Sequence, residues 1–100
     1  MQVTFRNKKL EKCYGDYKSA CREWGNDVAR KYIQRIDIIQ ETANMKDLCA
    51  LPGLNCHELK GNRAGQYAIT LLGFWRLIFT LRDKQMEIVR VEEVSKHYGD

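Results

Sequence analysis

The sequence predicts an α+β fold in which the helices come first and the strands last. Apolar residues recur every three to four positions through the first half of the chain, which is the spacing of amphipathic helices. After Pro52 and Gly53 the spacing changes to two, which is typical of strands. Because helices and strands are grouped separately, we expect two to three N-terminal helices on one face of a small twisted antiparallel sheet of four to five strands.

The whole chain of 100 residues should form one domain, residues 1–100, because no repeat, low-complexity tract or linker divides it. At its start, apolar and polar residues alternate over residues 1–6, which predicts a short strand. Asn7 is a typical cap for a first helix over 8–14. A second helix should begin near Asp16 and end before Gly25.

The central part of the sequence predicts one long helix and one short helix. The long helix should begin at Asn26, a capping residue, and run to about Thr42. Its buried stripe would consist of Val28, Ala29, Tyr32, Ile33, Ile36 and Ile38 or Ile39. Asn44 should cap a shorter helix that ends at Ala50, with Asp47 reaching back as in a capping box.

Four strands are predicted in the second half, over residues 54–59, 66–72, 74–81 and 86–94. A glycine-containing loop separates the first two strands, and Gly73 lies at the turn between the second and third. In the third strand, one face carries Trp75, Leu77, Phe79 and Leu81, which should pack on the helices. Arg76 then points to the opposite, open face of the sheet.

The charge distribution favours an anionic partner. The formal net charge is +4. Between Leu59 and Arg82 there is no Asp or Glu, whereas four cations occur: Lys60, Arg63, Arg76 and Arg82. A basic loop that leads into a rigid hairpin is typical of proteins that bind phosphate groups, and nucleic acid is the first candidate.

The cysteines argue against zinc and against export. Cys13, Cys21, Cys49 and Cys56 include no pair with two intervening residues, so a zinc site is not predicted. No charged and apolar leader opens the sequence, and no apolar run is long enough to cross a bilayer. We therefore expect reduced, mostly buried thiols in a cytoplasmic protein without a cofactor.

Arg76 allows two interpretations. An arginine at the centre of a strand is costly unless it is solvated or paired, so it is a candidate for binding a phosphate. Alternatively, it is a surface residue that pairs across strands with Glu58, Glu87 or Glu92 and contributes little.

Histidine, carboxylate and tyrosine side chains add a possible chemistry. His57 precedes the basic loop, and His97 and Tyr98 follow Glu93 near the end of the chain. Metal-independent RNA cleavage needs a base for the 2′-hydroxyl, cations for the phosphorane and an acid for the leaving 5′-oxygen. Each histidine taken alone is more often a partly exposed residue without a role.

Several short motifs resemble one family. The segments are Leu51-Pro52-Gly53, then His57-x-Leu59-Lys60-Gly61-x-Arg63-x-Gly65-Gln66-Tyr67-x-Ile69, then Trp75-Arg76-Leu77-x-Phe79, then Glu87-Ile88-Val89. Together they resemble the HigB-type toxins of the RelE/ParE superfamily, also known as plasmid maintenance killers. The match is dense from about Asp47 to Val94, whereas the N-terminal helices agree in pattern only.

The resemblance implies a RelE-like microbial RNase fold and a toxin of a bacterial type II toxin–antitoxin system. The implied activity is cleavage of mRNA in the ribosomal A site by 2′-hydroxyl attack, without a metal, which inhibits translation. The implied partners are the ribosome, mRNA and a cognate HigA-type antitoxin with a helix-turn-helix fold. The complex with the antitoxin would bind operator DNA.

Carried over by position, the resemblance assigns catalytic roles to His57, Arg76 and Glu93. His97 and Tyr98, which follow Glu93 in the chain, are the candidates for the catalytic histidine and tyrosine that the family has near its C-terminus. The resemblance assigns RNA or ribosome binding to Lys60 and Arg63, and Arg82 extends this basic set. The C-terminus departs from the family pattern, in which a carboxylate is followed directly by Tyr and His. Here Val94 and Ser95 occupy those two positions, and His97 and Tyr98 come later in reverse order.

Two other functions are compatible with the sequence. A ParE-like inhibitor of DNA gyrase would use the same fold without catalysis. A small basic module that binds RNA or protein, or a toxin that has lost activity, would also fit. The histidine and tyrosine set favours the nuclease, because a gyrase inhibitor needs no acid–base pair.

Overall fold

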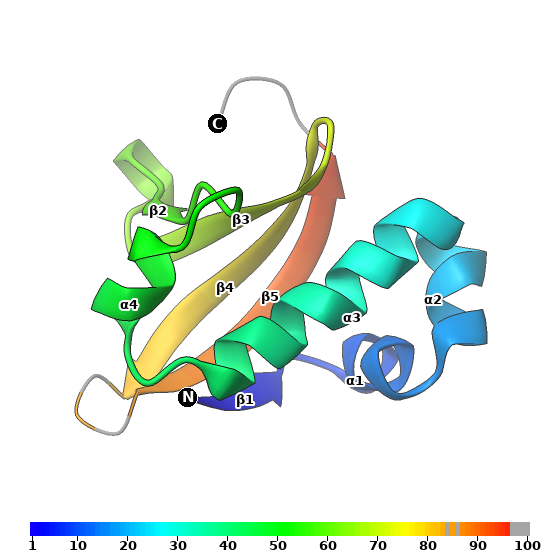
Figure 1. Ribbon diagram of the computed structural model, residues 1–100, viewed down its shortest axis with the longest axis horizontal. Helices are drawn as coiled ribbons and strands as arrows, with labels where there is room; N and C mark the ends of the chain where they lie inside the picture. The colour runs from blue at the N-terminus through cyan, green and yellow to red at the C-terminus, as the bar shows by residue number, and fades with distance from the viewer. Residues whose placement is uncertain (84, 86, 97–100) are drawn as a thin grey trace.

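A computed structural model describes residues 1–83, 85 and 87–96 of the chain. One short strand and four helices come first, and four strands follow after a loop (Figure 1). The elements in order are β1 Gln2–Phe5, α1 Lys8–Gly15, α2 Tyr17–Trp24, α3 Asn26–Glu41, α4 Met45–Ala50, β2 His57–Glu58, the 3₁₀ turn η1 Gly61–Arg63, β3 Gln66–Leu72, β4 Trp75–Asp83 and β5 Ile88–Lys96. This confirms the predicted α+β class.

The five strands form one sheet in the order β1-β5-β4-β3-β2. The pairs β2–β3, β3–β4 and β4–β5 are antiparallel, as local hairpins require. The β1–β5 pair is parallel, with Gln2 opposite Ile88 and Phe5 opposite Val91, so the sheet is mixed. The prediction of an antiparallel sheet was wrong for this pair. It assumed hairpins between consecutive strands, whereas β1 and β5 are far apart in the sequence.

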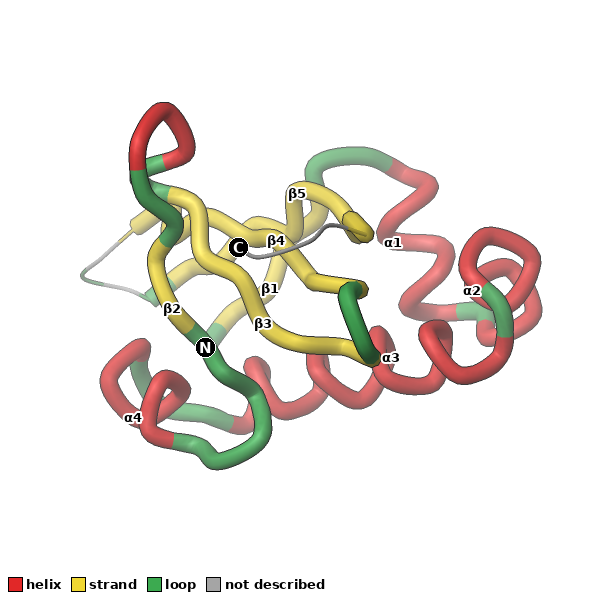
Figure 2. The backbone as a smooth tube through the Cα atoms, turned by 90° about the horizontal axis from the view of Figure 1, so that it is seen from above, coloured by secondary structure: helices red, strands yellow, loops and turns green. Residues whose placement is uncertain are grey.

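The main core lies between the helices and one face of the sheet. Helix α3 runs along this face (Figure 2) and contributes the fully buried side chains of Tyr32, Ile36 and Ile39. The sheet contributes Ile69, Leu71, Leu77, Phe79, Val89 and Val91 to the same cluster. Trp75 and Leu81 pack against this core as partly buried residues, so the predicted inward face of β4 is confirmed.

Side-chain caps start three of the four helices. Oδ1 of Asn7 accepts a hydrogen bond from Leu10 N at 2.9 Å, and Oδ1 of Asn44 accepts one from Asp47 N at 2.9 Å. Asp16 caps α2 in the same way. The prediction for α3 was wrong in one detail: the cap residue is Gly25, with φ +84°, and Asn26 is the first helical residue.

The strand predicted over residues 54–59 is much shorter in the structure. Only His57 and Glu58 pair with β3. Asn55 has a left-handed φ of +49°, which interrupts an extended chain. The carbonyl of Leu54 instead accepts a hydrogen bond from Thr70 N at 2.8 Å, which fixes the loop to β3. Strand β5 runs to Lys96 and so includes two residues that the sequence assigned to a tail.

The predicted state of the cysteines is met only in part. The four cysteines are free thiols, but only Cys13 and Cys56 are buried, and Cys49 is exposed. Within residues 1–83, 85 and 87–96, no helix has both the length and the apolar character needed to span a membrane.

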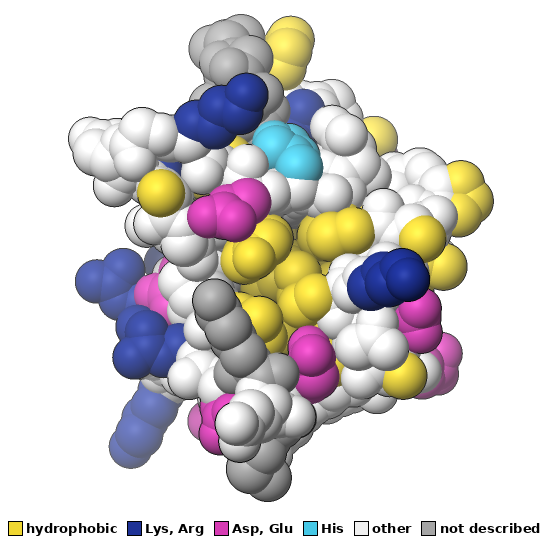
Figure 3. Space-filling model, turned by 90° about the vertical axis from the view of Figure 1, so that its left-hand side faces the viewer, with side chains coloured by type: hydrophobic (Ala, Val, Ile, Leu, Met, Phe, Trp, Pro, Cys, Tyr) yellow, Lys and Arg dark blue, Asp and Glu magenta, His cyan; other side chains and the backbone are white. Residues whose placement is uncertain are grey.

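On the side where α4 and β2 lie, apolar side chains gather in a shallow hollow that charged side chains border (Figure 3).

The buried hydroxyl of Tyr32 gives a test of the helix packing. It donates a hydrogen bond to Leu10 O at 2.7 Å and so ties α3 to α1. Tyr32→Phe should lower the free energy of unfolding by about 1 kcal/mol, measured by urea denaturation. Tyr17→Phe is the matched control, because Tyr17 is 42% exposed and its change should stay within about 0.5 kcal/mol. Equal effects of the two changes would contradict this packing.

Candidate active site

The face of the sheet opposite the helices carries most of the predicted site residues. The pairing register places His57 opposite Ala68, Ala68 opposite Ile78, and Ile78 opposite Glu93. These four residues form one row across β2, β3, β4 and β5. Since neighbouring strands lie about 4.8 Å apart, His57 and Glu93 stand at the two ends of a row about 14 Å long. We call this surface the open face.

The middle of the row is apolar. Ala68 and Ile78 are fully buried and form a second, small cluster with Leu59, which is 8% exposed. This cluster lies behind the polar side chains of the open face and separates His57 from Glu93. Glu93 is therefore too far along the row to orient His57 directly.

His57 has a defined ring orientation. Its Nδ1 lies 2.8 Å from the carbonyl oxygen of Asn55. A carbonyl can only accept, so Nδ1 carries the proton, and in the neutral ring Nε2 is left as an acceptor. A pocket of about 310 Å³ is lined by His57, Glu58, Leu59 and Lys60. This histidine can therefore accept a proton from a group bound beside the basic loop.

Arg63 crosses from the basic loop to β5. Its Nη2 lies 3.3 Å from Glu93 Oε2. Its Nε and Nη2 also donate to Gln66 Oε1, at 3.1 and 2.9 Å. The ion pair is half-exposed, so it orients both side chains more than it stabilises the fold. The structure thus joins a residue assigned to RNA binding with one assigned to catalysis.

Arg76 lies one row away from His57 and Glu93. It is opposite Thr70 on β3 and Ser95 on β5, two residues along β4 from Ile78. Its Nη1 donates to the carbonyls of Gly73 at 2.7 Å and Trp75 at 3.0 Å, so the guanidinium group is held at the β3–β4 turn. The strand spacing and rise place its Cα about 12 Å from that of His57.

The carboxylates considered as cross-strand partners of Arg76 have contacts elsewhere. Glu58 accepts a hydrogen bond from Gly65 N at 3.0 Å, and Glu87 accepts one from Met45 N at 3.3 Å. Glu92 lies only 2.7 Å from both Thr80 Oγ1 and Arg90 Nε. Each of the three carboxylates is therefore oriented by one of these contacts.

The Glu92 cluster was not recognised from the sequence. Glu92 is 8% exposed. Burial alone would raise the pKa of its carboxyl group, but the hydrogen bonds from Arg90 and Thr80 outweigh it, and the net pKa lies below the ordinary value. A bulge in the β4–β5 register next to Ile78 brings Glu92 and Glu93 to the same side of β5. Alternation predicts opposite sides for neighbouring residues and so could not find this.

Of the remaining predicted site residues that the structure describes, one lies beside His57 and the other does not. Lys60 is exposed beside His57. Arg82 is exposed six residues along β4 from Arg76, a distance of about 20 Å, and thus lies at the far end of the strand. His97 and Tyr98 lie outside the described residues. Strand β5 ends at Lys96, whose Nζ lies 5.8 Å from the centre of the Trp75 ring.

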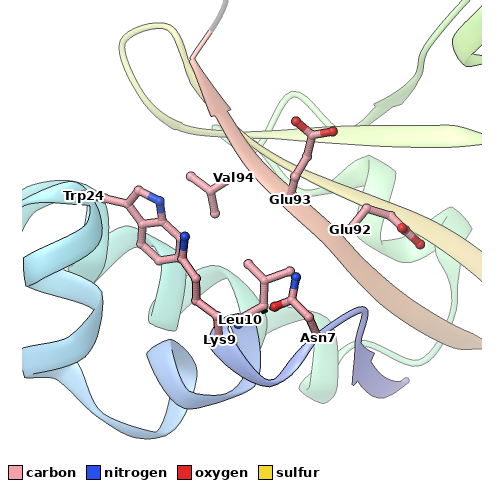
Figure 4. A pocket seen from close by; sticks show the side chains of 7 residues that line it. All are labelled: Asn7, Lys9, Leu10, Trp24, Glu92, Glu93 and Val94. Carbon is pink, nitrogen blue, oxygen red and sulfur yellow. Dashed lines mark hydrogen bonds between the residues drawn. The ribbon is translucent and has the colours of Figure 1, made fainter.

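A second pocket lies on the helical side of β5. It has a volume of about 160 Å³ and is lined by Asn7, Lys9, Leu10, Trp24, Glu92, Glu93 and Val94. Figure 4 shows Val94 pointing toward Trp24, whereas Glu92 and Glu93 point away from it. The carboxylate groups therefore belong to the open face. Among the described residues, no group of three His, Cys, Asp or Glu side chains could hold a metal ion.

Comparison with known proteins identifies the family. A family model described as a RelE-like toxin of the type II toxin–antitoxin system HigB matches residues 3–93. The chain belongs to this HigB-like toxin family. The resemblance that the motifs indicated is thereby confirmed. No curated protein sequence matches this HigB-like toxin significantly.

Solved toxins share the fold of this HigB-like toxin at low sequence identity. The YoeB/ParE toxin from Agrobacterium tumefaciens is 14% identical with a TM-score of 0.66, and the match covers 98% of this chain and 100% of that one. YafQ from E. coli is 16% identical with a TM-score of 0.65, over 96% and 92%. The YoeB–YefM complex from Staphylococcus aureus matches at 18% and 0.60, over 98% of both chains. These similarities confirm the RelE-like fold.

The Glu92 cluster predicts a pH-dependent contribution to stability. A pKa that is lowered on folding contributes stability above the ordinary value of 4.5. This contribution is lost as the pH falls through the lower, folded value. Glu92→Gln should cost about 1.5 to 3 kcal/mol near pH 7, and its difference from the wild type should narrow below pH 4.5 in urea titrations. Glu93→Gln, at the half-exposed pair, should cost at most about 1 kcal/mol.

Proposed function

We propose that this HigB-like toxin is a ribosome-dependent endoribonuclease that cleaves mRNA in the A site by attack of the 2′-hydroxyl, without a metal. The observation that carries the proposal is the arrangement of the open face. His57, the Arg63–Glu93 pair and Arg76 surround the apolar pair Ala68 and Ile78 on one rigid sheet. Membership of a family of RelE-like toxins supports the same activity.

The separations suit a phosphodiester bound over the apolar pair. The Cα atoms of His57 and Arg76 are about 12 Å apart, and both side chains are long enough to contact one phosphate between them. Arg76 would leave the carbonyls of the β3–β4 turn and bind the phosphate in their place. A guanidinium group matches the equatorial oxygens of the phosphorane, where negative charge develops.

Each proton in the reaction needs its own group. Nε2 of His57 would accept the proton of the 2′-hydroxyl, and the 2′-oxygen would attack phosphorus. The leaving 5′-oxygen then needs a proton donor. His97 would supply that proton and Tyr98 would stack on a base, both from outside the described residues. Glu93 is three strand spacings away from His57 and cannot orient that ring. The histidine that Glu93 would orient is therefore His97.

The basic residues would hold RNA through its backbone. Lys60 is exposed beside His57, and Arg63 is fixed over the sheet by Glu93 and Gln66. Phosphate contacts of this kind give affinity without reading sequence. Arg82, about 20 Å from Arg76 along β4, would contact ribosomal RNA or a more distant part of the message.

We further propose that the protein acts in the cytoplasm and is neutralised by an antitoxin. Solved complexes of YoeB with YefM and of YafQ with DinJ share the fold. A HigA-type antitoxin with a helix-turn-helix fold is the expected partner here, and the complex would bind operator DNA.

The decisive experiment maps mRNA 5′-ends by primer extension, with translating ribosomes and with naked RNA. Cleavage only in the presence of ribosomes is the expected result. Equal cleavage of naked RNA would contradict ribosome dependence. Inhibition of purified gyrase in a supercoiling assay, with no RNA cleavage, would replace the proposal by the ParE-like alternative.

The phosphate role of Arg76 predicts a large loss of cleavage rate. Arg76→Ala should lower the rate constant on translating ribosomes about 10²- to 10³-fold, and His57→Gln should lower it by a similar factor. Arg30→Ala is the control, because Arg30 is an exposed arginine on α3, 68% accessible. Unchanged rates in both site variants, with the fold intact by circular dichroism, would rule out these roles.

The backbone-binding role of Lys60 predicts a change in salt dependence. Lys60→Ala should reduce the slope of log affinity against log salt by about 1 for binding to ribosomes, measured by sedimentation at several salt concentrations. Lys18→Ala, at an exposed lysine on α2, should leave the slope unchanged. A slope that stays the same in both variants would place the RNA away from the basic loop.

A further inference from the structure

Two thiols lie next to each other on the helical side of the sheet, at its β2 edge. Cys49 is in the last turn of α4, and Cys56 directly precedes β2 and His57. Their sulfur atoms are 3.3 Å apart. Cys49 is exposed, whereas Cys56 is 9% exposed. The function proposed above uses neither residue.

The pair is distinct from the other cysteines and from a metal site. Cys13 lies on α1 and Cys21 on α2, away from α4. In the part of the chain that the structure describes, no third His, Cys, Asp or Glu completes a metal-binding group with Cys49 and Cys56. The chemistry left for two adjoining thiols, one exposed and one buried, is oxidation.

We propose that Cys49 and Cys56 form a reversible oxidation site, which a hydroperoxide converts into an intramolecular disulfide. The Cys49 thiolate attacks the peroxide oxygen, the O–O bond breaks, and Cys49 becomes a sulfenic acid as hydroxide or alkoxide leaves and takes a proton from water. The sulfur of Cys56 then attacks the sulfur of Cys49. The S–O bond breaks, the proton of Cys56 and the hydroxyl leave as water, and the S–S bond remains.

Burial assigns the two cysteines different steps. Cys49 is reached by solvent and so meets the oxidant first. Burial, with the adjoining Cys49, raises the pKa of the Cys56 thiol well above its ordinary value. Cys56 is therefore mostly protonated and reacts with peroxide more slowly than the exposed Cys49.

The local backbone can accommodate the bond. The sulfur atoms must approach from 3.3 Å to about 2.05 Å. The intervening residues 51–53 are exposed, and Gly53 has a φ of +85° with open space around it. Beyond residue 53 the loop is held by the carbonyl of Leu54, which accepts from Thr70 N, and by the carbonyl of Asn55 beside His57 Nδ1. Leu48 of α4 is fully buried in the core, so the approach of about 1 Å falls to rotation of the two cysteine side chains and to adjustment of the exposed residues 51–53.

The disulfide would act directly on the neighbourhood of His57. It closes a ring over residues 49–56, and this ring contains Asn55, whose carbonyl accepts the Nδ1 proton of His57. Oxidation would thus tie α4 to the strand that carries His57. The chemistry of the pair does not depend on the proposed RNA cleavage.

The test treats the purified reduced chain with hydrogen peroxide and then blocks the remaining thiols with an alkylating reagent in denaturant. The wild type should lose two of its four thiols and two hydrogens in mass, and dithiothreitol should restore both. Trypsin releases one peptide, residues 47–60, that contains Cys49 and Cys56 and no other cysteine. This peptide should carry the mass loss and resist alkylation.

Variants separate the proposed order of steps from general oxidation. Cys49→Ser should keep all its thiols at the peroxide dose that converts the wild type. Cys56→Ser should accumulate a sulfenic acid at Cys49, trapped by dimedone. Cys13→Ser should still lose two thiols. Three results in the wild type would overturn the proposal. They are sulfinic acid at Cys49 with no disulfide to Cys56, a disulfide between two chains, and a disulfide that involves Cys13 or Cys21.

Discussion

The placement of β4 between β3 and β5 is the constraint on which both the core and the candidate site depend. Side chains on a strand alternate, so each residue that β4 commits to the core directs its neighbour to the open face. Phe79 and Leu77 are fully buried, and this burial fixes the register of the strand. A slip by one residue would expose both and bury Arg76, so the position of Arg76 is secured by the packing behind it.

Much of this arrangement follows from the sequence. Three helix starts and the two faces of β4 could be predicted, because caps and alternation are local signals. The ion pair of Arg63 with Glu93, at 3.3 Å, could not, since the partners are far apart in the chain. The bulge beside Glu92 is also invisible to a pattern that assumes strict alternation. His97 and Tyr98 stay predictions, as do the catalytic roles of the residues on the open face.

Charge on the open face is balanced more closely than the composition implies. Residues 60–82 include no Asp or Glu, and β5 supplies the carboxylates beside them. Glu93 pairs with Arg63, and Glu92 accepts from Thr80 and from Arg90 of its own strand. Such pairing keeps cations oriented before a ligand arrives, at the cost of competition with that ligand. The face is therefore a set of oriented donors around an apolar floor rather than a diffuse positive surface.

The parallel pairing of β1 with β5 has a consequence for synthesis of the protein. Gln2 pairs with Ile88, and β5 occupies an inner position in the sheet, between β1 and β4. Contacts between such distant segments form late and slow folding, because a long loop must close first. During translation β1 has no partner in the sheet, and β4 has only β3, until β5 has left the ribosome. The sheet, and with it the open face, is consequently complete only after β5 has been made.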